Sequence, residues 1–205
     1  MVAVVQKTAP VLREKAEAVN KKDFESPRLK KILAQMSEAL EKEEDGIAIA
    51  APQVGIPLRI FIVSHRAFEF AEQEGGAGLE DLSLKNPVAE TSAKQKYSNM
   101  VFINPEITKL SRKKHWAAEG CLSVRWLYGE VSRAEKATVR GYDEHGKPFM
   151  RGASGLLAQV FQHETDHLNG ILFIDKARNV EKITQQEQIA REQRERNEIN
   201  SKTSK

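Results

Sequence analysis

The chain has 205 residues, with 32 basic and 29 acidic side chains and a formal net charge of +3. A net charge this small does not by itself indicate nucleic-acid binding, and the single cysteine excludes an internal disulfide and is typical of a reducing compartment. No apolar run is long enough to span a membrane and no signal-peptide pattern precedes the first element, so we expect a cytoplasmic protein of one domain with a polar tail.

The first predicted element is a helix. Ser26 and Pro27 are typical of the N-cap and the first turn of a helix. Apolar residues then follow at helical spacing from Leu29 to Leu40. The pattern predicts a helix that ends near Glu44.

The next elements are strands. Short apolar runs predict strands at 58–63 and 100–104. Two further runs, at 137–142 and 147–151, flank the turn sequence Asp-Glu-His-Gly at 143–146 and predict a hairpin. Because these strands precede a long amphipathic helix, we expect an α+β fold with mainly antiparallel sheets packed around that central helix.

Two segments lack this regularity. Residues 65–99 are rich in glycine and turn residues, and we interpret them as a surface insertion that is either inert or shapes the entrance of a site. Residues 179–205 mix basic and acidic side chains, which predicts a solvated tail that is helical in part. The expected organisation is a main domain at 1–178, including the insertion, followed by this polar tail.

The most informative pattern is H-E-T-D-H, which extends from His163 to His167 in a helix expected between Ser154 and Gly170. Histidines four residues apart on a helix project from the same face and can bind one metal ion. Glu164 then lies where it can take a proton from a metal-bound water. Two core histidines hydrogen-bonded to the backbone are the alternative, which is costly because both rings and a carboxylate would be buried without a common partner.

Two imidazoles leave a metal site incomplete, so a third ligand is needed. In one class of H-E-x-x-H proteins it is a histidine farther along the chain, at the position that Phe173 occupies here. A later glutamate serves in another class, but the later glutamates lie in the polar tail. The remaining candidate is Cys121, although a lone cysteine is commonly a small buried hydrophobe. A thiolate with the imidazoles of His163 and His167 leaves a fourth position for water, as in catalytic sites.

Three segments together resemble a known family. Residues 46–55 (GIAIAAPQVG), 119–123 (EGCLS) and 162–168 (QHETDHL) occur in the order of the three signature motifs of peptide deformylases. The segment APVLR at 9–13 is also similar to the opening of that family, and the resemblance covers residues from about 3 to 176. It implies a hydrolase that removes the N-formyl group from the N-terminal methionine of newly made proteins and releases formate.

The resemblance also implies roles for individual residues. A metal-bound water is the nucleophile and Glu164 the general base and acid, while the Gln53 side-chain amide and the Leu122 backbone N–H stabilise the oxyanion. The methionine slot and the peptide-binding backbone have their candidates in the same motifs and on the helix stripe: Gly46, Ile47, Gly120, Leu156 and Val160. An ion-pair network is expected around the ligands, formed by Glu119, Arg133 and Asp166.

The implied cofactor is one divalent metal ion. Thiolate and imidazole ligands suit several ions; the family's usual ion is Fe²⁺, with Zn²⁺, Ni²⁺ or Co²⁺ expected in some purified samples. The implied partners are formyl-methionyl nascent peptides, with no membrane contact and no direct nucleic-acid site. The tail after residue 178 either docks on the ribosome, as in bacterial relatives, or is a plain solvated segment.

Two other functions stay open at this point. A protease that cleaves internal peptide bonds needs a third ligand later in the chain, and Phe173 disfavours it. A degenerate deformylase-like protein that binds peptides without turnover is disfavoured by Glu164 and Gln53. Ala48 and Tyr128, which depart from the family pattern, leave this second alternative open. Together with two further departures, Arg125 and Trp126, they bear on the shape of the site entrance.

Overall fold

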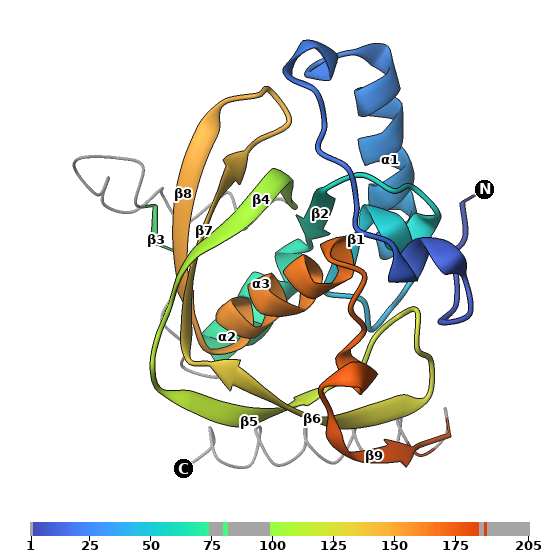
Figure 1. Cartoon of the computed structure of the whole chain (residues 1–205), viewed down its shortest axis with the longest axis vertical. Coiled ribbons are helices and arrows are strands. Elements are labelled where there is room, and N and C mark those ends of the chain that lie inside the picture. The colour runs from blue at the N-terminus through green and yellow to red at the C-terminus, as the bar shows by residue number, and fades with distance from the viewer. Residues whose placement is uncertain (1, 74–79, 82–98, 185–186, 188–205) are drawn as a thin grey trace.

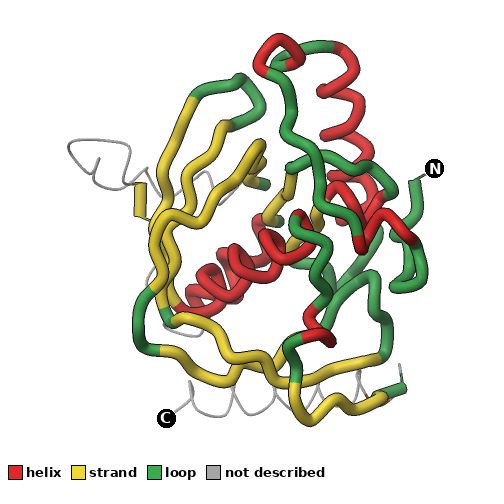
Figure 2. Tube along the Cα trace, in the orientation of Figure 1, coloured by secondary structure: helices red, strands yellow, loops and turns green. Residues whose placement is uncertain are grey.

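The helix that carries the H-E-x-x-H pattern, α3 (Gly155–Leu168), lies between two antiparallel sheets (Figure 1). The structure is a computed structural model and describes residues 2–73, 80–81, 99–184 and 187. Its alternation of helices and antiparallel strands (Figure 2) confirms the predicted α+β class with a central metal-motif helix. Within the described residues, no helix has the length and hydropathy to cross a membrane.

The larger sheet has six strands, all antiparallel to their neighbours. In sheet order they are β1 (Ala48–Ala50), β2 (Ile60–Val63), β4 (Met100–Leu110), β7 (Lys136–Tyr142), β8 (Pro148–Ser154) and β3 (Glu80–Asp81). The predicted strands and the hairpin are confirmed. β4 continues past its predicted end because register shifts after Ile103 accommodate Pro105, which cannot donate to the ladder.

The smaller sheet has three strands, in the order β5 (Lys114–Glu119), β6 (Leu127–Ala134) and β9 (Arg178–Lys182). The predicted helical tail is wrong at its start, since residues 179–182 belong to β9 and pair with β6. Every β9 side chain is exposed, so its charge pattern is that of a solvated segment and does not reveal the backbone pairing. Most of the predicted tail, like most of the insertion, lies outside the described residues.

α1 (Pro27–Glu41) begins where it was predicted, with the Ser26 hydroxyl accepting a hydrogen bond from the Leu29 N–H at 3.2 Å. It ends at Glu41, before the predicted Glu44. The guanidinium of Arg66 donates to the Leu40 carbonyl and to the carbonyls of the following turn. These bonds satisfy carbonyls that another helical turn would have used.

The insertion begins with a helix, α2 (His65–Gln73), which directly follows β2. The expectation of an irregular surface segment is therefore wrong for this part. Ala67, Phe68 and Ala71 share one helical face by their spacing and are buried in the core. The described residues also contain four short 3₁₀ helices: η1 (Pro10–Arg13), η2 (Lys21–Asp23), η3 (Ala51–Val54) and η4 (Phe173–Asp175).

The core fills both faces of β1 and β2. On one face Phe61, Phe102 and Phe161 pack as an aromatic cluster, with ring centroids 4.4 Å apart for the first two and 5.1 Å for the last two. On the other face α1 packs against Ile60 and Ile62. β2 is therefore apolar at every position, and α3 is held against the sheet by its own Phe161.

Candidate functional site

Three side chains that can bind a metal ion meet beside α3. His163 and His167 lie one helical turn apart with ring centroids 4.9 Å from each other, and Cys121 follows the end of β5. The Cys121 Sγ is 3.2 Å from the His167 Nε2. One candidate ligand atom from each residue lies within 4.8 Å of the other two. One thiolate and two imidazoles at this spacing fit a single divalent ion.

A buried ion-pair network supports the first histidine. The Nδ1 of His163 lies 3.0 Å from the Glu119 carboxylate, which leaves the Nε2 atom for an ion. Arg133 donates to both Glu119 oxygens, at 2.7 and 2.9 Å, and to Asp166 at 2.7 Å. Lys176 reaches Asp166 at 2.6 Å from the protein surface. The predicted network of Glu119, Arg133 and Asp166 is confirmed.

The charge state of Glu119 follows from these contacts. Burial by itself raises the pKa of this carboxyl, but the hydrogen bonds from Arg133 and His163 outweigh burial and lower the pKa to about 2. Glu119 is therefore an anion at neutral pH and accepts the His163 N–H. Burial lowers the pKa of His167, which keeps that ring neutral and able to bind a metal.

Glu164 has the opposite environment. It is only 4% exposed, and its Oε2 is buried without a hydrogen-bond partner among the described residues. Burial raises the pKa of Glu164 to about 7. A carboxyl that exchanges its proton near neutral pH is suited to general acid–base chemistry.

Gln53 is held in η3, which contains Pro52 in its first turn and is capped at its C-terminal end by Gly55 with a φ of 78°. Its Oε1 accepts a hydrogen bond from the Ala50 N–H at 2.8 Å, and its Nε2 lies 3.5 Å from the Cys121 Sγ. The hydrogen bond that Oε1 accepts orients the side-chain amide so that its Nε2 faces the metal ligands. An amide nitrogen carries two N–H groups, so Gln53 keeps a donor for a further acceptor.

The Leu122 backbone is oriented by the turn that follows Cys121. The Cys121 carbonyl accepts a hydrogen bond from the Val124 N–H at 3.0 Å. Because the C=O and N–H of a trans peptide point in opposite directions, the Leu122 N–H points away from Val124. It has no acceptor among the described residues. Gln6, which no motif identified, donates to the Leu122 carbonyl at 3.2 Å and anchors the next peptide unit.

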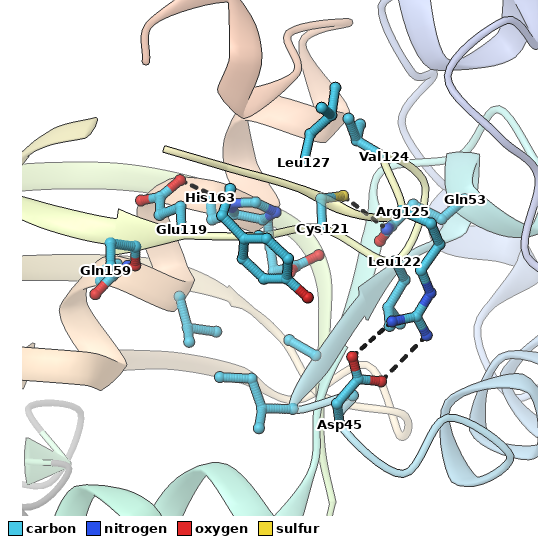
Figure 3. Close-up of a pocket in the computed structure, with 18 of the residues that line it drawn as sticks. Asp45, Gln53, Glu119, Cys121, Leu122, Val124, Arg125, Leu127, Gln159 and His163 are labelled. Carbon is cyan, nitrogen blue, oxygen red and sulfur yellow. Dashed lines mark hydrogen bonds and ion pairs between the residues drawn. The ribbon is translucent and has the colours of Figure 1, made fainter. Parts of the chain in front are cut away.

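These groups open onto a cavity of about 260 Å³ (Figure 3). The predicted ligands Cys121 and His163, the base Glu164, and the donors Gln53 and Leu122 line it. So do all the predicted substrate-binding residues: Gly46, Ile47, Gly120, Leu156 and Val160. His167 lies behind them and is 1% exposed.

Tyr128, expected near the entrance, also lines the cavity, whereas Asp45 and Leu127 line it without having been predicted as site residues. No local pattern distinguishes them, since contacts between distant segments bring them to the cavity. Ala48 of β1, one of the departures noted in the sequence, pairs with Val63 of β2. Its backbone is extended, so the added methyl group needs no left-handed conformation.

Comparison with known proteins agrees with this geometry. The family model described as polypeptide deformylase matches residues 1–183. A peptide deformylase from Desulforudis audaxviator is 36% identical over 179 residues, covering 87% of this chain and 95% of the relative. Among solved structures, a class I type b peptide deformylase from Acinetobacter baumannii with bound Met-Ala-Ser has a TM-score of 0.67 and 28% identity over 85% of this chain and 98% of that one. A probable peptide deformylase from Synechococcus phage S-SSM7 has a TM-score of 0.65 and 34% identity over 86% of this chain and 99% of that one.

Proposed function

The chain belongs to the polypeptide deformylase family, and from this premise we propose which of its residues remove the N-formyl group from the N-terminal methionine of new proteins. Family membership makes the chain a hydrolase that releases formate, and the alternatives of an internal protease and a non-catalytic peptide binder have no support. One observation carries the residue assignments. Candidate ligands, a buried carboxyl and two oriented hydrogen-bond donors surround a single cavity.

Cys121, His163 and His167 are the residues that would hold the metal. The proximity of their donor atoms and the Glu119 contact to His163 support this assignment. A divalent ion bound there supplies Lewis acidity, which lowers the pKa of a coordinated water toward neutrality. From the family resemblance we propose Fe²⁺ as the native ion, with Zn²⁺, Ni²⁺ or Co²⁺ able to replace it in purified protein.

The protein's own groups move the proton and stabilise charge. Glu164 accepts the proton of the attacking water at its carboxylate and later gives it to the departing amine. As the formyl carbonyl is attacked, its oxygen gains negative charge and accepts hydrogen bonds from the Gln53 Nε2 and the Leu122 N–H. Both donors are oriented before substrate binds, so little reorganisation is needed.

The substrate is a formyl-methionyl peptide. We propose that Ile47, Leu156 and Val160 form the apolar slot for the methionine side chain, while backbone groups of Gly46 and Gly120 bind the peptide main chain. The Acinetobacter relative with bound Met-Ala-Ser supports a methionine-led peptide as ligand.

The catalytic domain is proposed to end after β9, at Lys182 rather than at residue 178, because β9 pairs with β6. A ribosome contact through the tail beyond it and a cytoplasmic location both stay predictions from the sequence.

The test is formate release from formyl-Met-Ala-Ser by anaerobically purified protein whose metal content is measured on the same sample. Glu164→Gln is expected to lower kcat by about 10²- to 10⁴-fold with the metal content unchanged. Glu106→Gln is the matched control, since that carboxylate is exposed on β4, and should leave kcat unchanged. Full activity of Glu164→Gln would exclude the base assignment. A metal-loaded wild-type protein without turnover would exclude the proposed reaction.

A further inference from the structure

The cavity mouth lies between two segments that are distant in sequence, residues 45–48 and residues 121–128. Arg125 joins them. Its Nη1 is 2.5 Å from the Asp45 Oδ2 and its Nη2 is 3.1 Å from the Asp45 Oδ1, and it also forms an ion pair with Glu43. Figure 3 shows the two-pronged contact with Asp45 at the edge of the cavity. We call Glu43, Asp45 and Arg125 the Arg125 clasp.

Hydrogen bonds from Arg66 hold the backbone of the segment that carries the two acidic residues of the clasp. Arg66, on α2, donates from its Nη1 to the carbonyls of Glu43 at 2.9 Å and Glu44 at 2.8 Å. Its Nη2 donates to the Leu40 carbonyl at 3.0 Å. These bonds attach the turn that carries Glu43 and Asp45 to α2. Through the clasp, the same turn holds Arg125 on the opposite side of the mouth.

The Arg125 side chain is only partly exposed, at 22%, with its partners at 30% and 31%. A bidentate guanidinium–carboxylate contact in such a position has a defined geometry, unlike a fully exposed ion pair. Two carboxylates face one guanidinium, so the clasp has a formal charge of −1. This charge disfavours an acidic substrate side chain at the mouth.

Trp126, which also lines the cavity, has a left-handed backbone with a φ of 66°. This conformation is unfavourable for a bulky residue and persists only where the surroundings impose it. Here Trp126 is fixed on both sides. Its carbonyl accepts a hydrogen bond from the Ile183 N–H at 2.9 Å, and the preceding residue is Arg125, whose guanidinium carbon lies 5.8 Å from the indole centroid.

We propose that Arg125 is a positioning residue that holds Trp126 at the mouth, and that Trp126 selects substrates whose second residue is aromatic or large and apolar. The inference rests on the proposed function. The methionine slot is proposed at Leu156 and Val160 on α3, and Trp126 lines the same cavity from another segment, so we expect the second residue of the peptide to leave the slot beside Trp126. An indole there gains contact area and ring stacking with a large side chain.

The kinetic test compares formyl-Met-Phe-Ser, formyl-Met-Ala-Ser and formyl-Met-Asp-Ser. The wild type is expected to have a kcat/KM about tenfold higher for the phenylalanine peptide than for the alanine peptide, as one aromatic contact gives, and the lowest value for the aspartate peptide. Trp126→Ala removes the phenylalanine preference and Trp126→Phe retains it. Arg125→Ala reduces the preference mainly through KM, and Arg125→Lys restores only part of it because lysine lacks the bidentate fork.

Arg140→Ala is the matched control, because its ion pair with Glu106 is exposed and distant from the cavity; it should not alter the preference. The inference is overturned if Arg125→Ala or Trp126→Ala lowers kcat/KM equally for all three peptides, or leaves the preference intact.

A second readout is independent of turnover. The chain has two tryptophans, so Trp116→Phe leaves Trp126 as the only indole emitter. In that background, Arg125→Ala is expected to increase acrylamide quenching of Trp126 fluorescence, whereas Arg140→Ala leaves it unchanged. If the wild type fails to hydrolyse any formyl peptide, the proposed function fails, and increased quenching still supports the positioning role. Unchanged quenching in Arg125→Ala overturns it.

Discussion

Replacing Arg133 with leucine is expected to lower the free energy of unfolding by about 3–5 kcal/mol, the usual cost of removing one partner from a buried ion pair. The Arg133 side chain is 4% exposed and bridges Glu119 on β5 to Asp166 on α3 through three hydrogen bonds. Its removal leaves two buried carboxylates with one partner each. Glu119 keeps His163, and Asp166 keeps Lys176.

The assay is urea unfolding of the metal-free proteins at neutral pH, since bound metal would add its own stabilisation. A loss of this size corresponds to a Tm lower by about 10 °C for a chain of this length. Arg140→Leu breaks an ion pair whose side chains are 59% and 60% exposed, so its cost should stay below about 1 kcal/mol. If Arg133→Leu costs no more than Arg140→Leu, the buried network does not stabilise the fold and the reasoning fails.

Three further predictions concern other parts of the molecule. The pKa of Glu119, lowered to about 2 from an ordinary 4.5, contributes about 3 kcal/mol that is present above about pH 4.5 and lost as the pH falls toward 2; urea titrations of the apoprotein should show this loss, and Glu119→Gln should reduce it. Phe102→Ala, at a fully buried ring that packs on three others, should cost about 3–5 kcal/mol in the same assay, and a cost below about 1 kcal/mol would contradict the packing. Gly120→Ala places a Cβ 2.7 Å from the Tyr128 ring, so it should raise KM for formyl-Met-Ala-Ser, and Tyr128→Ala in the same chain should restore it; a persistent defect would contradict the ring clash.

Local patterns were sufficient for the elements whose signals are contained in a few residues. Ser26 caps the start of α1 because its hydroxyl can accept a hydrogen bond from a free N–H of the first turn. The hairpin around 143–146 forms at the predicted turn. The histidines of α3 lie on one face because four residues nearly complete a helical turn. Each of these predictions depends on a repeat or a cap that is visible in the sequence.

The rest depends on partners distant in sequence. α1 stops at Glu41 because Arg66 binds the carbonyls that follow, and β9 is a strand because β6 offers it a backbone edge. The bond between Arg125 and Asp45 likewise crosses from one segment of the fold to another. No periodicity, cap or turn motif encodes such contacts, so a single sequence does not predict the shape of the cavity mouth.

The position of α3 between the two sheets has a consequence for the order of folding. The larger sheet and α3 share one aromatic core, but Cys121 reaches the histidines only when the smaller sheet packs against that helix. A complete set of ligands therefore exists only after the smaller sheet has packed against α3. In refolding with Co²⁺, the thiolate-to-cobalt absorption band should develop later than the helical signal. We therefore expect the complete metal centre to form late in folding, and a cobalt–thiolate band that develops as early as the helical signal would contradict this order.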